Sequence, residues 1–188
     1  MTIRPFIIVA FGLVVGCEKH SEFEQQLVDE SKQFKIELLA TLGEAERIEV
    51  VEHSWPHDFD LSVGQSIQDL PHLEYKRVVL EDIQSAKLID AIDAMSDAPQ
   101  TIFTFCLFEA HHSLEIYGPR GIKNTAYVCF RCGDTEWNSE SRGVPREFQS
   151  VFRRFIEPLG FRAERDWRAL TEQDAQQGVP AKSDRSGG

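Results

Sequence analysis

The segment from 101 to 132 constrains the fold more than any other part of the chain, because it contains three successive runs with strand character. Residues 101–108, 112–117 and 125–132 are rich in aromatic and β-branched side chains, which favour strands. Gly118–Gly121 separates the second run from the third, and its proline and glycines stand where a tight turn needs them. Three neighbouring runs of this kind predict antiparallel hairpins.

Shorter patterns on both sides add further strands and two amphipathic helices. Residues 46–54 and 75–80 are predicted as strands, and a short strand is expected near Glu136. Residues 82–95 and 145–160 repeat apolar side chains at helical spacing, which predicts two helices with one apolar face each. Between the first two strands, residues 55–73 contain two prolines and are predicted to form a long loop.

These elements predict an α+β fold with two layers. We expect an antiparallel sheet of about five strands, two helices packed on one face of it, and an additional N-terminal helix over 18–43. The apolar residues of the N-terminal helix fall near one stripe, at Phe23, Leu27, Phe34, Leu38 and Leu42. This stripe predicts either packing against the domain or a stalk that carries it.

The charge balance and the missing motifs exclude several classes of function. The 20 Lys and Arg residues face 31 Asp and Glu residues, a net charge of −11. Binding to nucleic acid requires a basic surface, so we expect no nucleic-acid partner. The chain also lacks a Gly-rich phosphate loop, a nucleophile elbow and the zinc-protease motif. We therefore assign no catalytic residue and expect a non-enzymatic binding or structural module.

The N-terminus has the features of a targeting segment. Arg4 precedes an apolar run from Phe6 to Val15, which is shorter than the roughly 20 residues that span a bilayer. Its length is typical of the apolar region of a signal peptide. The run ends in Val14-Val15-Gly16-Cys17, which resembles the lipobox of bacterial lipoproteins.

The resemblance implies lipidation and a location outside the cytoplasm. Residues 1–16 would be a signal peptide, and Cys17 would carry a diacylglyceryl group and further acyl chains such as palmitate. Several acyl chains, at about 0.8 kcal/mol for each buried methylene, hold a protein stably at a membrane. We expect a lipid anchor and helical or stalk segment at 17–43, the α+β domain at 44–170, and a disordered tail at 171–188. The bacterial cell envelope is the expected location.

Cys106, Cys129, Cys132 and His112 are the candidate site residues. The three cysteines with one histidine could form a zinc site, and zinc is the one cofactor that these residues suggest. They could instead serve a thiol-dependent enzyme, form a Cys106–Cys129 or Cys129–Cys132 disulfide, or remain buried thiols. In an unbent strand, Cys129 and Cys132 would point to opposite faces. By the same alternation, His112 is predicted to face inward and His111 outward.

The spacing of these residues carries a second resemblance. The pattern resembles that of an uncharacterised bacterial family of envelope and hypothetical proteins. In that pattern a cysteine is followed by a Pro-x-His step before a strand, and later by Cys-Phe-x-Cys. The similarity covers about residues 46–161, with His112 at the histidine position and Ala110 in place of the proline. It implies no activity.

Overall fold

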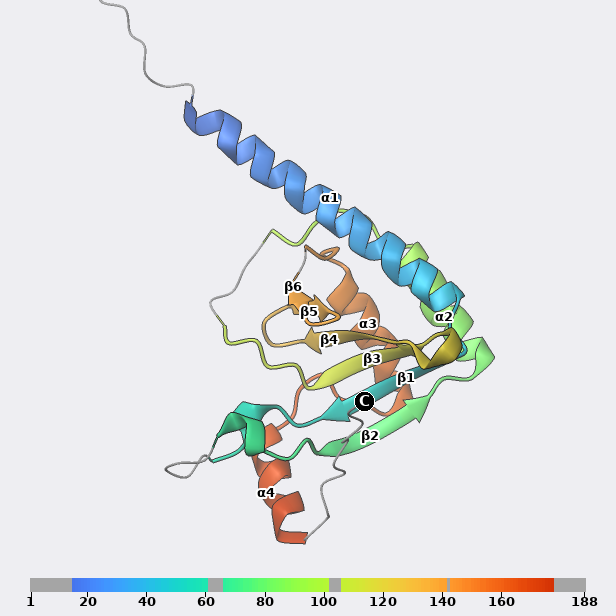
Figure 1. Ribbon diagram of the computed structural model, residues 1–188, viewed down its shortest axis with the longest axis vertical. Coiled ribbons are helices and arrows are strands. Elements are labelled where there is room, and N and C mark those ends of the chain that lie inside the picture. Colours follow the sequence, from blue (N-terminus) through green and yellow to red (C-terminus); the bar gives the residue numbers. More distant parts are fainter. Residues whose placement is uncertain (1–14, 61–65, 102–105, 142, 178–188) are drawn as a thin grey trace, which may run out of the picture.

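An antiparallel sheet of six strands lies at the centre of the computed structural model, which describes residues 15–60, 66–101, 106–141 and 143–177 (Figure 1). The strand order is β2-β1-β3-β4-β5-β6, and every neighbouring pair is antiparallel. Together with the helices, this sheet confirms the predicted α+β class. It has six strands where about five were predicted.

The strands follow the predicted positions except at the two cysteine-containing runs. Their bounds are Arg47–His53 (β1), Glu74–Val79 (β2), His112–Tyr117 (β3), Lys123–Cys129 (β4), Asp134–Trp137 (β5) and Glu140–Ser141 (β6). The strand predicted at 101–108 is wrong at residue 101 and at 106–108, while 102–105 lie outside the described residues. The backbone just before this run pairs elsewhere, since Pro99 forms an isolated bridge with Pro145.

Four helices accompany the sheet. Their bounds are Val15–Gly43 (α1), Asp82–Asp93 (α2), Phe148–Ile156 (α3) and Trp167–Gln177 (α4). The predicted loop at 55–73 contains two short 3-10 turns, at Pro56–Asp58 and Ile67–Asp69, and its residues 61–65 lie outside the described part. In the described residues, no helix combines the length and the apolar composition required to cross a bilayer.

The main core joins one face of the sheet to side chains from three helices. Alternating residues of the central strands share this face, so their apolar side chains fall into one buried cluster. The strand members include Ile48, Val50, Leu114, Ile116, Ala126 and Val128. The helical members include Phe34 and Leu38 from α1, Leu88 and Ile92 from α2, and Phe148 and Phe152 from α3.

Helix α1 contributes to this core from Phe34 onward. Phe34 is 1% exposed and meets Trp137 and Phe148 edge-to-face, with ring centroids 6.0 Å and 5.2 Å away. Polar contacts fix the same helix, because Lys35 Nζ donates a hydrogen bond to the carbonyl oxygen of Met95 at 2.6 Å. Part of α1 therefore packs in the core, while the N-terminal part of α1 extends away from the sheet (Figure 1).

Helix α4 occupies residues that the sequence assigned to a disordered tail. Residues 171–177 continue this helix, and the side chain of Thr171 is buried. The hydroxyl groups of Tyr75 and Thr171 share a hydrogen bond of 2.7 Å, and Trp167 stacks on the ring of Tyr75. Both contacts involve Tyr75, a strand residue distant in the sequence, so the polar composition after residue 171 gave no indication of them. Residues 178–188 lie outside the described part.

Candidate functional site

A tight turn folds Cys132 back over Cys129. Cys129 ends β4, and Gly133 adopts a left-handed conformation with φ of 70°, which a glycine reaches without strain. The backbone N–H of Gly133 donates to the carbonyl oxygen of Cys129 at 2.9 Å, and that of Cys132 donates to the sulfur of Cys129 at 3.3 Å. The expectation for an unbent strand does not apply, because the chain leaves the strand at Cys129.

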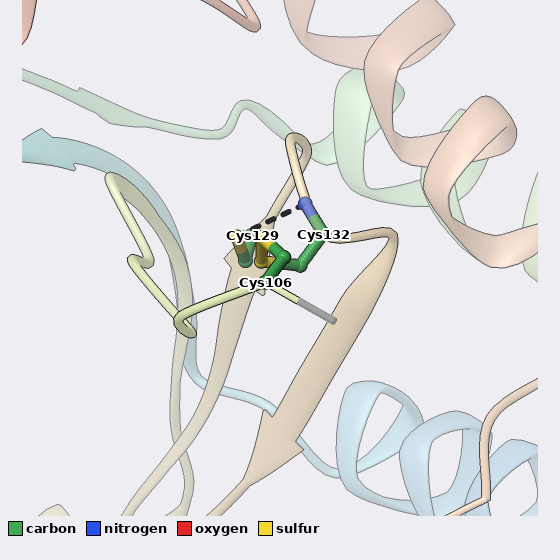
Figure 2. Close-up of side chains that lie close together, drawn as sticks. All are labelled: Cys106, Cys129 and Cys132. Atoms are coloured by element: carbon green, nitrogen blue, oxygen red, sulfur yellow. Dashed lines mark hydrogen bonds between the residues drawn. A yellow bond between two sulfur atoms is a disulfide. The ribbon is translucent and has the colours of Figure 1, made fainter. Parts of the chain in front are cut away.

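The structure brings all three predicted cysteines together (Figure 2). Cys106 forms a disulfide with Cys132, with Cα atoms 5.6 Å apart, whereas Cys129 keeps a free, buried thiol. This pairing is neither of the two that the sequence suggested. The three sulfur atoms lie within 4.8 Å of one another. The site therefore places a thiol directly beside a disulfide.

The environment of the Cys129 thiol favours its protonated form. Burial raises the pKa of this thiol, and hydrogen bonds from the backbone N–H groups of Glu109, Cys132 and Arg131 oppose the increase only in part. A buried thiol with a raised pKa is a weak nucleophile at neutral pH. The same N–H groups would stabilise the sulfur once it lost its proton.

His112 does not join the cysteines. It faces the core side of the sheet as predicted, 1% exposed and opposite Val128 in the register of β3 and β4. Its ring packs edge-to-face against Phe130, with centroids 5.0 Å apart. Neither a Cys106–His112 pair nor a zinc site that includes His112 is assembled.

His112 belongs to a second set of polar side chains, which is buried inside the protein. The Nε2 atom of His112 lies 3.6 Å from Oε1 of Glu52, and Nε of Arg165 lies 3.1 Å from the same oxygen. Glu52 is 1% exposed. Burial lowers the pKa of His112, although its contact with Glu52 acts in the opposite direction. Sequence reasoning missed Glu52 and Arg165, because no local pattern relates positions more than 100 residues apart.

His111 is buried, so the prediction that it faces outward is wrong. Its Nε2 atom lies 3.0 Å from Oδ1 of Asp58, and its ring stacks on Trp167 with centroids 4.3 Å apart. Strand alternation predicts which face a residue occupies but not what covers that face. Here the turn at Asp58 and helix α4 cover it.

The two histidines border a small cavity. The lining includes His111, His112, Phe130, Arg165 and Trp167, and the cavity has a volume of about 130 Å³. Its wall combines aromatic rings with charged and imidazole groups. Arg165 in this wall pairs with Glu52 of β1, and Trp167 of α4 stacks on His111, so α4 and the segment before it are tied to the sheet.

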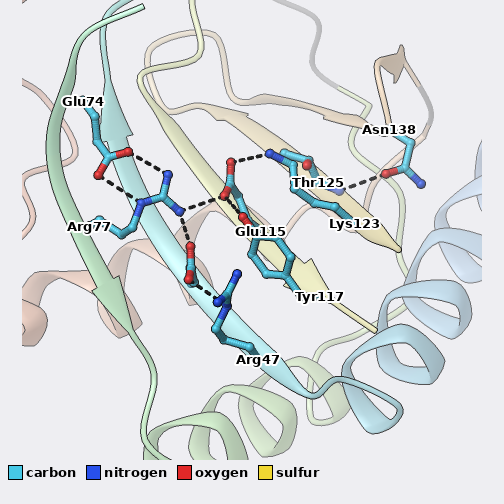
Figure 3. Close-up of polar contacts among 9 residues, drawn as sticks. Arg47, Glu74, Arg77, Glu115, Tyr117, Lys123, Thr125 and Asn138 are labelled. Atoms are coloured by element: carbon cyan, nitrogen blue, oxygen red, sulfur yellow. Dashed lines mark hydrogen bonds and ion pairs between the residues drawn. The ribbon is translucent and has the colours of Figure 1, made fainter. Parts of the chain in front are cut away.

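The opposite face of the sheet carries a network of ion pairs (Figure 3). Arg77 contacts Glu49, Glu74 and Glu115, which lie on three neighbouring strands. Glu115 accepts hydrogen bonds from Arg77 at 2.9 Å, Lys123 at 2.8 Å and Tyr117 at 2.7 Å. Burial alone would raise the pKa of Glu115, but these donors outweigh it and lower the pKa to about 2.

The Glu115→Gln variant is expected to lose about 2 kcal/mol of unfolding free energy at pH 7, the usual cost of losing hydrogen bonds to a charged group. The contribution of Glu115 is present above pH 4.5 and declines as the pH falls toward 2, because its pKa is depressed in the folded state. Urea titration of the wild-type chain and of the Glu115→Gln variant measures this loss of unfolding free energy. The exposed Glu46→Gln change is the control, and an equal effect of both variants would contradict the assigned role.

Comparison of the chain with protein-family models, curated proteins and solved structures gave no match.

Proposed function

We propose that the protein is a lipid-anchored lipoprotein of the bacterial cell envelope, with its α+β domain outside the cytoplasm as a binding or structural module. The observation that carries this proposal is the pairing of Cys106 with Cys132, two cysteines 26 positions apart. Disulfides persist in oxidising compartments outside the cytoplasm and are rare within it. This agrees with the compartment that the lipobox at Val14–Cys17 implies.

The position of Cys17 supports anchoring at a distance from the domain. Cys17 lies in the first turn of α1, and Leu27 is the first buried side chain among residues 22–43, the part of this helix whose side chains are described. Ten residues of α-helix separate them, a rise of about 15 Å at 1.5 Å per residue. An acyl group at Cys17 could therefore enter a membrane without forcing the folded domain into the lipid.

The arrangement of the buried charges favours a binding or structural role over catalysis. His111 is held by Asp58, while Glu52 lies between His112 and Arg165. Glu52 joins β1 to β3 and to the segment before α4, and Asp58 joins the turn after β1 to His111, so these groups stabilise the fold. The cavity of about 130 Å³ beside them is the place where a small ligand would bind.

Lipidation is tested by labelling cells with an alkyne analogue of palmitate while they produce the full chain. The wild-type chain is expected to take up the label, and its mature N-terminus is expected to be an acylated Cys17. The Cys17→Ser variant is expected to lose all label and to retain residues 1–16, since cleavage follows lipidation of this residue. Gel fluorescence and mass spectrometry of the intact chain measure both results.

The Cys129→Ser variant is the matched control, because it also removes one thiol but leaves the N-terminus unchanged. It is expected to keep the full label. An unmodified Met1 in the wild-type chain, or label that persists in Cys17→Ser, would refute the lipoprotein proposal.

A further inference from the structure

The three clustered cysteines have the dimensions of a metal-binding site. Cys129 and Cys132 come from one turn and Cys106 from the segment before β3, and their sulfur atoms lie within 4.8 Å of one another. Metal–sulfur bonds of about 2.3 Å in a trigonal arrangement place the sulfur atoms about 4 Å apart. Small side-chain movements would therefore suffice once the disulfide is open.

Backbone N–H groups at the turn that holds two of these cysteines act against the burial that keeps the Cys129 thiol protonated. The Cys132 N–H points at the sulfur of Cys129, at 3.3 Å, and the backbone N–H groups of Glu109 and Arg131 also bond to this sulfur. Hydrogen bonds from N–H groups favour a negatively charged sulfur. Gly133 permits the turn through its left-handed backbone.

We propose that, in its reduced form, the protein binds one thiophilic metal ion, Cu(I) or Zn²⁺, through the thiolates of Cys106, Cys129 and Cys132. Thiolate ligands select these soft or borderline ions over magnesium and calcium. Among the described residues, no histidine or carboxylate belongs to the cluster, so the protein supplies three ligands. Three ligands suit an ion with trigonal coordination, or an ion with tetrahedral coordination that takes its fourth ligand from solvent.

Reduction of the Cys106–Cys132 disulfide must precede binding. A dithiol reductant transfers two electrons and two protons to this disulfide, which yields two thiols while the reductant forms its own disulfide. Metal binding then displaces the protons of the three thiols. The oxidised chain retains one thiol at the site, so oxidation would release the ion.

The test uses the full chain with Cys17→Ser, so that only the three clustered cysteines remain as thiols. The chain is reduced with a phosphine, freed of reductant without air, and titrated separately with Zn²⁺ and with Cu(I). Elemental analysis is expected to give one ion per chain for at least one of the two metals. Ultraviolet absorption from sulfur-to-copper charge transfer would report thiolate ligation in the Cu(I) titration.

Two controls identify the ligands. The first control is the oxidised chain, which needs no further mutation, and the second is the reduced chain with Cys129→Ser. Each is expected to bind the metal ion about 100-fold more weakly than the reduced chain with all three cysteines. Circular dichroism checks that both remain folded. The proposal is overturned if the reduced chain binds neither ion, if either control binds as tightly, or if reduction unfolds the chain and metal does not restore it. None of these results depends on lipidation, so the two proposals fail independently.

Discussion

Replacing Phe34 with alanine is expected to lower the free energy of unfolding by about 3–5 kcal/mol, the range for removing a buried aromatic ring. Phe34 is 1% exposed and packs on Trp137 and Phe148. Its removal opens a cavity between α1 and the rest of the core, which the rigid sheet could fill only in part. Urea titration followed by tryptophan fluorescence measures the loss.

Phe23 provides a matched control on the same helix. Its ring is 54% exposed, so Phe23→Ala is expected to change the free energy of unfolding by less than about 0.5 kcal/mol. Equal, small effects of the two substitutions would mean that α1 is a stalk separate from the core. A large effect at Phe34 alone would place the start of the folded domain within α1.

Mild acid is expected to destabilise the protein strongly because of His53. Burial lowers the pKa of this imidazole to about 3, and the neighbouring His72 acts in the same direction, whereas the hydrogen bond to the Ser54 carbonyl opposes them. The folded state therefore binds fewer protons than the unfolded state below pH 6.5. The contribution of neutral His53 to the free energy of unfolding is fully present above pH 6.5 and falls as the pH drops toward 3.

The size of this effect follows from the pKa difference. Each pH unit below 6.5 removes about 1.4 kcal/mol, so His53 alone is expected to cost about 2 kcal/mol at pH 5. His112, whose pKa is also lowered, adds to the loss. The free energy of unfolding from urea titrations at pH 7, 6 and 5 measures the slope. The contribution of Glu115 declines only below pH 4.5, so it does not cause a slope between pH 7 and 5.

Two histidine substitutions test the assignment. His53→Phe keeps a ring between Trp55 and Tyr127 but removes the titrating group, so its stability is expected to fall less steeply between pH 7 and 5. The exposed His57→Gln change is expected to leave the slope unaltered. An unchanged slope in His53→Phe would show that other groups cause the acid sensitivity.

The sheet was predictable from the sequence where local patterns determine structure. The runs that became β1, β2, β3 and most of β4 carry β-branched and aromatic residues with clear turn residues between them. Alternation along β3 also predicted that His112 faces the core, and the structure confirms it. Both results depend on residues that are close in the sequence, and the periodicity of apolar residues reflects such local relationships.

The errors occur where distant residues determine the outcome. His111 is buried because Trp167 stacks on it, and residues 171–177 are helical because Thr171 reaches Tyr75. No periodicity links residues separated by more than 50 positions. The cysteine pairing depends instead on a local feature: Gly133, directly after Cys132, permits the turn that folds Cys132 back over Cys129.

The continuity of α1 has a mechanical consequence. One unbroken helix runs from Cys17 to the packed residues Phe34 and Leu38, so both ends move as one rigid arm. If Cys17 is attached to a membrane as proposed, a flexible linker would let the domain tumble about that point, whereas this helix would restrict the height and angle of the domain. Tension or tilt applied at the N-terminal end would therefore act directly on the interior of the protein.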